Sequence, residues 1–179
     1  MRWWWLVGAV VGCGGPPSDS DSGNTDSCTS EAIQLEVGTG EMQFLKLAAG
    51  DPVTLVHGPQ GGWHVWTAIQ SKFSEPEVSI LPSITVPSMG GLTLSGDQQA
   101  QFVALLYDEA TCDGAFAGLR AYVDTDQATG PTGLDLICAL EGVEMELCVN
   151  VTDIVDGRSA DQCVTVTAEL DAVDVPNCP

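Results

Sequence analysis

The chain has 179 residues, with 5 Lys and Arg against 25 Asp and Glu, and its formal net charge is −20 at pH 7. A chain this acidic repels nucleic acid phosphates and anionic lipid head groups, which excludes a nucleic acid partner and electrostatic docking on a membrane. Hydrophobic residues make up 44% of the chain. An acidic disordered polymer has far fewer, so we expect a folded domain.

Residues 1–12 have the features of a secretory signal peptide. Arg2 supplies one positive charge, an apolar run extends from Trp3 to Val11, and the small residue Gly12 follows. The run is shorter than the roughly 20 residues that a membrane-spanning helix needs. A cleaved signal peptide is therefore predicted.

The end of this segment, Val10-Val11-Gly12-Cys13, resembles the lipobox of bacterial lipoproteins, with Val in place of the usual opening Leu. The resemblance implies cleavage before Cys13 and lipidation of its sulfur, and Gly14 after it implies sorting to the outer membrane. An ordinary cleaved signal is the alternative. The chain would contact the membrane through its lipid anchor, because several acyl chains hold a protein stably where one does not. Residues 13–30 would hold the lipidated Cys13 and a disordered, acidic tether, rich in Gly, Pro, Ser and Asp.

Residues 31–179 are predicted to form a single all-β domain, an immunoglobulin-like β-sandwich, because short apolar runs alternate with Gly, Pro and Asp breaks. The stretch 97–108 is also compatible with a short helix. The expected strands are Ala32–Val37, Gln43–Leu47, Val53–His57, Trp63–Gln70, Val78–Ile80, Ile84–Val86, Leu92–Ser95, Gln101–Tyr107, Phe116–Val123, Leu134–Leu140, Glu144–Val151 and Gln162–Leu170.

The sequence HGPQGGWH holds the only two histidines of the chain, His57 and His64. Pro and Gly between two strand-like runs predict a hairpin turn. In a hairpin the two histidines are expected nearly opposite each other on one face, where they would suit Zn²⁺ or Cu²⁺. The alternative is that they hydrogen-bond the loop backbone and only orient the turn. No other cofactor is expected.

The segment from Gly40 to Gln70 resembles one found in exported lipoproteins of deltaproteobacteria, especially myxobacteria, whose function is unknown. The resemblance rests on Gly50 and on the HGxQGGxH pattern with its preceding Val56. It implies location in the cell envelope and brings no activity.

Seven cysteines are present, and lipidation of Cys13 would leave six for disulfides: Cys28, Cys112, Cys138, Cys148, Cys163 and Cys178. Disulfides imply an oxidising compartment outside the cytoplasm. Asp156-Gly157 is a hairpin turn signal. A hairpin folded there brings Cys148 and Cys163 together on the polar face, so this pair is expected to bond.

Three functions follow from these observations. The leading prediction is a lipid-anchored cell-envelope binding or structural module with a protein or glycan partner, and not an enzyme. The second is a metal-binding envelope protein that uses His57 and His64. The third is an envelope hydrolase, although G-x-S-x-G, H-E-x-x-H and P-loop motifs are all absent from the sequence.

Overall fold

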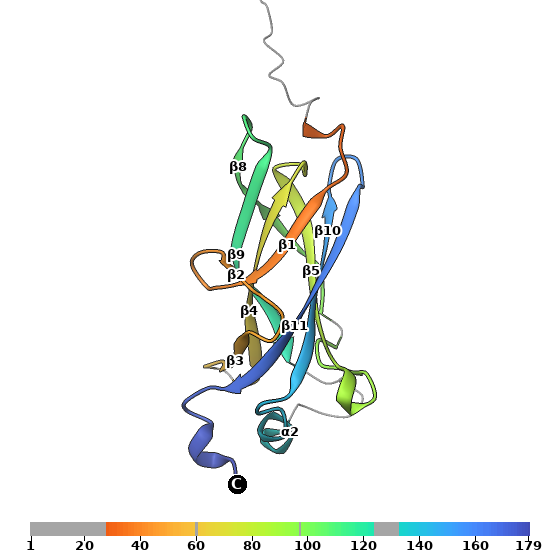
Figure 1. The fold of residues 1–179 in the computed structure, drawn as a ribbon. Coiled ribbons are helices and arrows are strands. Elements are labelled where there is room, and N and C mark those ends of the chain that lie inside the picture. Colours follow the sequence, from red (N-terminus) through yellow and green to blue (C-terminus); the bar gives the residue numbers. More distant parts are fainter. Residues whose placement is uncertain (1–27, 60, 97, 124–132) are drawn as a thin grey trace, which may run out of the picture.

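The computed structural model describes residues 28–59, 61–96, 98–123 and 133–179. Eleven strands in this part of the chain form one mixed sheet that folds into two layers (Figure 1). The strands are β1 (Gln34–Thr39), β2 (Leu45–Lys46), β3 (Pro52–His57), β4 (Trp63–Lys72), β5 (Glu77–Val86), β6 (Leu92–Thr93), β7 (Gln101–Ala104), β8 (Leu106–Asp108), β9 (Asp113–Val123), β10 (Glu144–Asp153) and β11 (Ser159–Leu170).

Strand β3 joins the two layers. Its residues Pro52–Leu55 run parallel to β11, whereas Val56 and His57 pair antiparallel with β4. One layer holds β2, β1, β4, β9 and β8, and the other holds β11, β10, β5, β6 and β7. The expected all-β, sandwich-like fold is confirmed.

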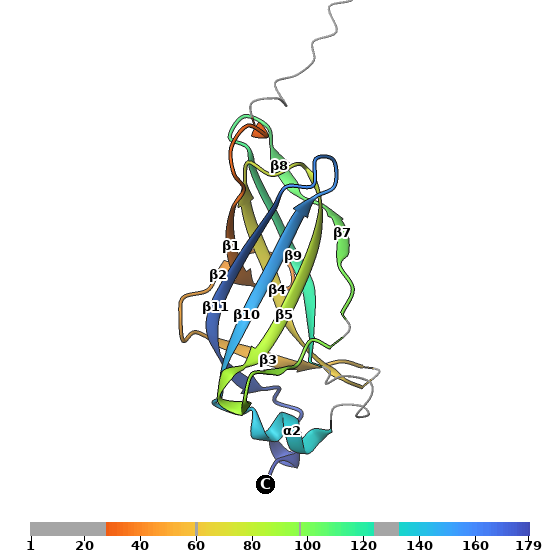
Figure 2. The ribbon, with the colours of Figure 1, turned by 90° about the vertical axis from the view of Figure 1, so that its right-hand side faces the viewer.

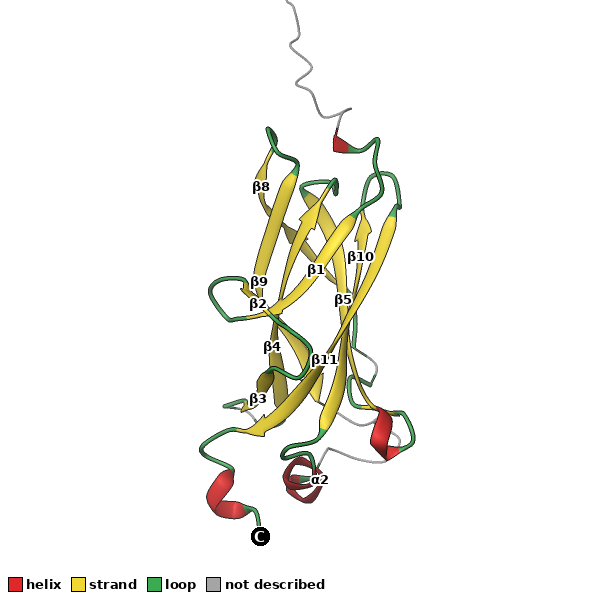
Figure 3. Ribbon diagram, viewed as in Figure 1, coloured by secondary structure: helices red, strands yellow, loops and turns green. Residues whose placement is uncertain are grey.

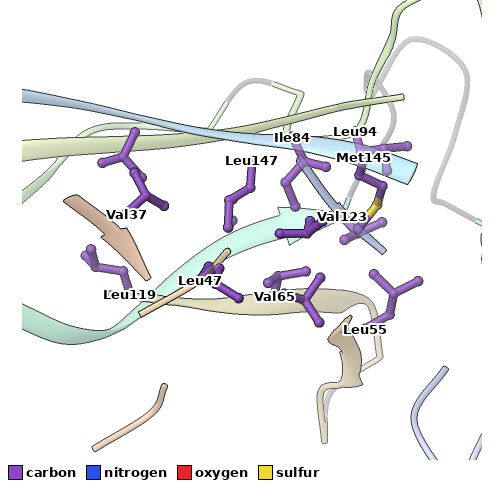
Figure 4. Close-up of a cluster of buried hydrophobic side chains, with 14 of the residues drawn as sticks. Val37, Leu47, Leu55, Val65, Ile84, Leu94, Leu119, Val123, Met145 and Leu147 are labelled. Carbon is purple, nitrogen blue, oxygen red and sulfur yellow. The ribbon is translucent and has the colours of Figure 1, made fainter. Parts of the chain in front are cut away.

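The core lies between these layers (Figure 4). Ile84 and Leu147 point inward from β5 and β10, and Val65 and Leu119 point toward them from β4 and β9. All four side chains are at most 1% exposed. Period-two alternation explains this arrangement, because every second residue of a strand faces the same side.

Strand β5 corrects one expectation, because two strands were predicted where one long strand runs through Pro82. Pro82 pairs with Val149 of β10. On its other side, β5 pairs with β7 only over Glu77–Ile80 and with β6 only at Thr85–Val86. Pro82 falls in the gap between them, where its missing N–H costs no ladder hydrogen bond.

The predicted strand Leu134–Leu140 is wrong, because Leu134–Ala139 forms the helix α2 at one end of the sandwich (Figure 3). The helix buries Ile137, and Leu140 just after it is also fully buried. A spacing of three residues places these two on one helical face, and Leu and Ala favour helix. Strand alternation would have placed them on opposite faces.

The ambiguous stretch 97–108 contains strands over its described residues. Gln101–Ala104 (β7) pairs with β5, and Leu106–Asp108 (β8) pairs with β9. The predicted single strand Gln101–Tyr107 is therefore two short strands, because the chain passes from one layer to the other between them.

Three disulfides cross-link the domain, and they are typical of proteins that fold outside the cytoplasm. Cys148 bonds to Cys163 directly across the β10–β11 ladder, as expected. Cys28 bonds to Cys112, and Cys138 bonds to Cys178. The bond to Cys112 fixes residue 28, at the end of the predicted tether, to the folded domain, where Cys28 is only 4% exposed.

Residues 1–27, which hold the predicted signal peptide, Cys13 and most of the tether, lie outside the described residues. Within the described part of the chain, no helix has the length and apolar character required to cross a membrane.

Candidate functional site on the two sides of the histidine hairpin

The predicted turn between His57 and His64 is present. Strands β3 and β4 pair antiparallel on either side of it, and the Gly58 N–H donates to the Gly62 carbonyl at 2.9 Å. Gly61 and Gly62 have φ of 85° and 79°. These positive angles favour glycine, so the two glycines serve the turn itself.

The two histidines do not face each other, which corrects the expected geometry of a shared metal site. His57 pairs with Trp63, and His64 pairs with Val56. Neighbouring residues of a strand point to opposite faces, so the two rings lie on opposite sides of the hairpin. The physical reason is that the connection, residues 58–62, has an odd number of residues. It places His57 opposite Trp63, so His64 is one position out of step with His57.

On the first side, a buried carboxylate joins His57 to Trp63. Asp174, which is 2% exposed, accepts hydrogen bonds from Trp63 Nε1 at 2.6 Å and from His57 Nδ1 at 2.8 Å. The two rings also contact each other in a tilted arrangement, with centroids 4.8 Å apart. Because a carboxylate only accepts, His57 Nδ1 carries the proton in this arrangement.

Asp171 adds a second contact from the same C-terminal segment. Its carboxylate accepts the His57 backbone N–H at 3.1 Å. The N–H groups of His57 and Val173 hold the pKa of Asp171 below its ordinary value. The Cys138–Cys178 disulfide ties the end of this segment to α2, at the same end of the molecule (Figure 1). This side of the hairpin is therefore an anchor for the C-terminal segment.

A carboxylate on His57 Nδ1 is also how hydrolases orient a catalytic base. Among the described residues, the hydrogen-bond partners of His57 are the two aspartates, and neither supplies a nucleophilic hydroxyl. Within the described part of the chain, the His57 ring bonds a carboxylate of the C-terminal segment, whereas the turn-orienting alternative expected bonds to the loop backbone.

On the second side, four side chains of β4 and β9 form what we call the aromatic–arginine surface: His64, Trp66, Arg120 and Tyr122. His64 pairs with Tyr122 and Trp66 pairs with Arg120 across the ladder. The Arg120 guanidinium lies 5.0 Å from the centre of the Trp66 ring. Among the described residues Arg120 makes no ion pair, and Tyr122 is 46% exposed.

His64 is the buried member of this surface. It is 7% exposed and meets Trp66 edge-on, with centroids 4.6 Å apart. Its Nε2 atom is buried and has no hydrogen-bond partner in the described part of the molecule. Burial, and then the charge of Arg120, lower the pKa of His64, while Glu41 offsets part of this shift. His64 is therefore a neutral imidazole at pH 7.

The loop after β1 borders the aromatic–arginine surface. Thr39 Oγ1 donates to the Trp66 carbonyl at 2.6 Å, and the Gly118 N–H donates to the Gly40 carbonyl at 3.0 Å. Gly118 has a φ of +82°, and a Cβ there would lie 2.7 Å from the Glu41 carbonyl oxygen. The close approach fixes this loop, in which Met42 is 88% exposed, across the face of the sheet.

The free edge of β9 is also held beside this surface. The Gln98 side chain donates to the Arg120 carbonyl at 2.6 Å and accepts the Tyr122 N–H at 3.0 Å. Its amide thus replaces a neighbouring strand at these two residues, which keeps Arg120 and Tyr122 in register with β4.

Sequence reasoning found His64 but missed Trp66, Arg120 and Tyr122. The alternation WHVW does place His64 and Trp66 on one face, and Arg120 and Tyr122 alternate with Leu119, Ala121 and Val123 in the same way. The pairing of β4 with β9 was the missing information, since only that pairing brings the two sets together.

One group of three potential metal ligands occurs in the described residues: Glu146, Cys148 and Cys163. The two sulfur atoms form a disulfide, so they are not thiolate ligands.

No protein-family model matches this sequence, and no curated protein matches it. Among solved structures, it is similar to the CooA pilin subunit from enterotoxigenic Escherichia coli, with 15% identity, a TM-score of 0.34, and coverage of 76% of this chain and 99% of the pilin chain.

Proposed function

We propose that the chain is a lipid-anchored cell-envelope binding module and that the aromatic–arginine surface contacts its partner. The observation that carries the proposal is the buried Nε2 of His64, which has no hydrogen-bond partner among the described residues and lies beside the Arg120 guanidinium over the Trp66 ring. A buried polar atom without a partner costs free energy in the isolated domain. A bound group that reached Nε2 would remove this cost.

The composition of the surface favours a protein partner over a glycan. Trp, Tyr and Arg are the residues most enriched among those that dominate protein–protein binding energy, and Met is also enriched at interfaces. Arg120 is one of only 5 basic residues of the chain. On an acidic molecule it would select a carboxylate or carbonyl group on the partner.

Site-specific photo-crosslinking in the native envelope tests this contact. A photoreactive amino acid at Tyr122 is expected to give a discrete adduct that Arg120→Ser weakens. The matched control replaces Val155, which is 78% exposed in the β10–β11 turn. Equal adducts from both positions, or an adduct indifferent to Arg120→Ser, would overturn the proposal. An adduct removed by glycosidases and not by proteases would assign a glycan partner instead.

The anchor is tested separately by metabolic labelling with radioactive palmitate. Label is expected on the wild-type chain and not on Cys13→Ser. An unlabelled wild-type chain would refute lipidation of Cys13 without affecting the proposed binding surface.

A further inference from the structure

The outer edge of β7 is an open and uncharged strand edge. β7 pairs with β5 on one side only, and no described strand pairs with its other side. Figure 2 shows β7 running along the margin of the sandwich. Phe102, a large apolar side chain of β7, is 75% exposed.

The backbone of this edge offers free hydrogen-bonding groups. The Leu105 N–H donates to the Pro76 carbonyl at 2.8 Å, so Leu105 and Val103 bond toward β5. In an antiparallel ladder the residues between them turn their N–H and C=O groups to the opposite side. Phe102 and Ala104 therefore present two donors and two acceptors at the open edge.

The other open edges of the sheet are blunted. β2 and β6 have two residues each, and β2 also carries Lys46. β8, which pairs only with β9, has three residues and carries Asp108. Short strands and edge lysines are the devices by which proteins prevent edge-to-edge pairing. β7 is longer, with four residues, and carries neither Lys nor Pro. In a chain of net charge −20, residues 98–107 carry no charge at all.

We propose that the β7 edge pairs with the β7 edge of a second copy to form a two-fold symmetric dimer. The uncharged edge lets two highly acidic molecules approach without bringing carboxylates together. It offers no negative charge that would favour a basic partner. With Val103 on the two-fold axis, Phe102 of one copy lies opposite Ala104 of the other, and Ala104 lies opposite Phe102. Large and small side chains then alternate across the junction, and both outward residues of each copy make their backbone hydrogen bonds.

One charged residue beside this edge, Glu77, pairs with Ala104 within its own copy. In the dimer the two Glu77 side chains stand in different rows with both β7 strands between them. The dimer is therefore compatible with the charge of the molecule. It does not depend on the aromatic–arginine surface, which lies on β4 and β9.

Sedimentation equilibrium of the full chain carrying Cys13→Ser, which prevents lipid-mediated association, tests the proposal. The chain is expected to show a reversible monomer–dimer equilibrium. Phe102→Lys and Ala104→Glu should each weaken the dimer by about tenfold or more, because each places a charge opposite an uncharged side chain. Met42→Lys, at an exposed apolar residue away from β7, should leave the equilibrium unchanged.

A mixture of the two variants tests the register. In a dimer of Phe102→Lys with Ala104→Glu, the new Lys lies opposite the new Glu, and Ala104 of the first copy lies opposite Phe102 of the second. The mixed dimer should regain most of the wild-type affinity, to within about threefold. A wild-type chain that stays monomeric at about 100 μM, a typical range for weak association, would overturn the proposal, and so would a mixture no tighter than either variant alone. Circular dichroism of each variant verifies that it is folded.

Discussion

At the residue scale, Asp174 has the strongest set of contacts around the histidine hairpin. One buried carboxylate accepts hydrogen bonds from two ring N–H donors on two strands, and the rings of those donors contact each other at a tilt. Charge-assisted hydrogen bonds of this kind are about twice as strong as neutral ones. Asp174 is thus the side chain through which the C-terminal segment stabilises the hairpin.

We expect Asp174→Ala to lower the free energy of unfolding by about 2–4 kcal/mol, because the N–H groups of Trp63 and His57 lose their acceptor while Trp63 remains buried. Asp171→Ala, in which two backbone N–H groups lose an acceptor in a solvated segment, should cost about 1 kcal/mol. Urea denaturation followed by Trp fluorescence measures both values. Equal losses for the two variants would show that burial of Asp174 adds nothing.

His64 gives a prediction about pH. The pKa of its ring is lowered in the folded state. As pH falls through about 6.5, the unfolded chain therefore binds a proton at this ring that the folded chain does not yet bind. Stability should therefore decrease with falling pH until the folded-state pKa is also passed. His64→Phe removes this contribution and should flatten the decrease.

The measurement is the urea midpoint at pH values from about 8 to about 5, where a free histidine titrates. His57 and the carboxyl groups are common to both proteins, so their contributions cancel in the difference. Identical pH profiles for wild type and His64→Phe would contradict the shift of the pKa of His64.

At the element scale, the alternation of apolar and polar residues predicted where most strands lie. It could not predict which strands pair with each other. Within the predicted strand Glu144–Val151, every second residue is buried: Met145, Leu147, Val149 and Val151. The same pattern failed for residues 134–139, where two periodicities fit a short apolar run equally well. Pairings distant in sequence, such as β4 with β9, leave no local signal, so the aromatic–arginine surface was not predictable from either strand alone.

The loop between β1 and β2 is held by its close approach to Gly118 of β9, and this contact can be tested. Gly118→Ala should displace this loop and cost about 2 kcal/mol or more, because the new Cβ meets the Glu41 carbonyl and the positive φ disfavours a side chain. Gly142→Ala is the matched control, since φ there is +69° but a Cβ would meet no atom within 4 Å. It should cost only about 1–2 kcal/mol. Thermal denaturation compares the two, and a milder effect at Gly118 than at Gly142 would exclude the close approach.

At the scale of the whole molecule, the three disulfides differ in how far apart along the chain their cysteines lie. Cys148–Cys163 closes a separation of 15 residues within one hairpin. Cys138–Cys178 and Cys28–Cys112 close separations of 40 and 84 residues and join elements that no local pairing connects. The loop closed by Cys28–Cys112 is the longest of the three and begins at residue 28. A force applied to the N-terminal segment would therefore act on the domain through this bond.

The free energy that each disulfide contributes should follow these separations. Loop-closure entropy of the unfolded chain predicts losses of about 3.0, 3.9 and 4.6 kcal/mol when the pairs with separations of 15, 40 and 84 residues are changed to Ala. The β10–β11 hairpin should keep its register without its disulfide, because nine residue pairs of the ladder define it. Urea denaturation of the three double variants gives the order, and hydrogen exchange reports whether β10 and β11 stay paired. If the Cys148/Cys163 variant were the least stable of the three, the disulfides would act through native packing and not through the unfolded chain. The Cys28/Cys112 variant should also lose protection selectively around residues 28 and 112, since this bond alone among the three reaches residue 28.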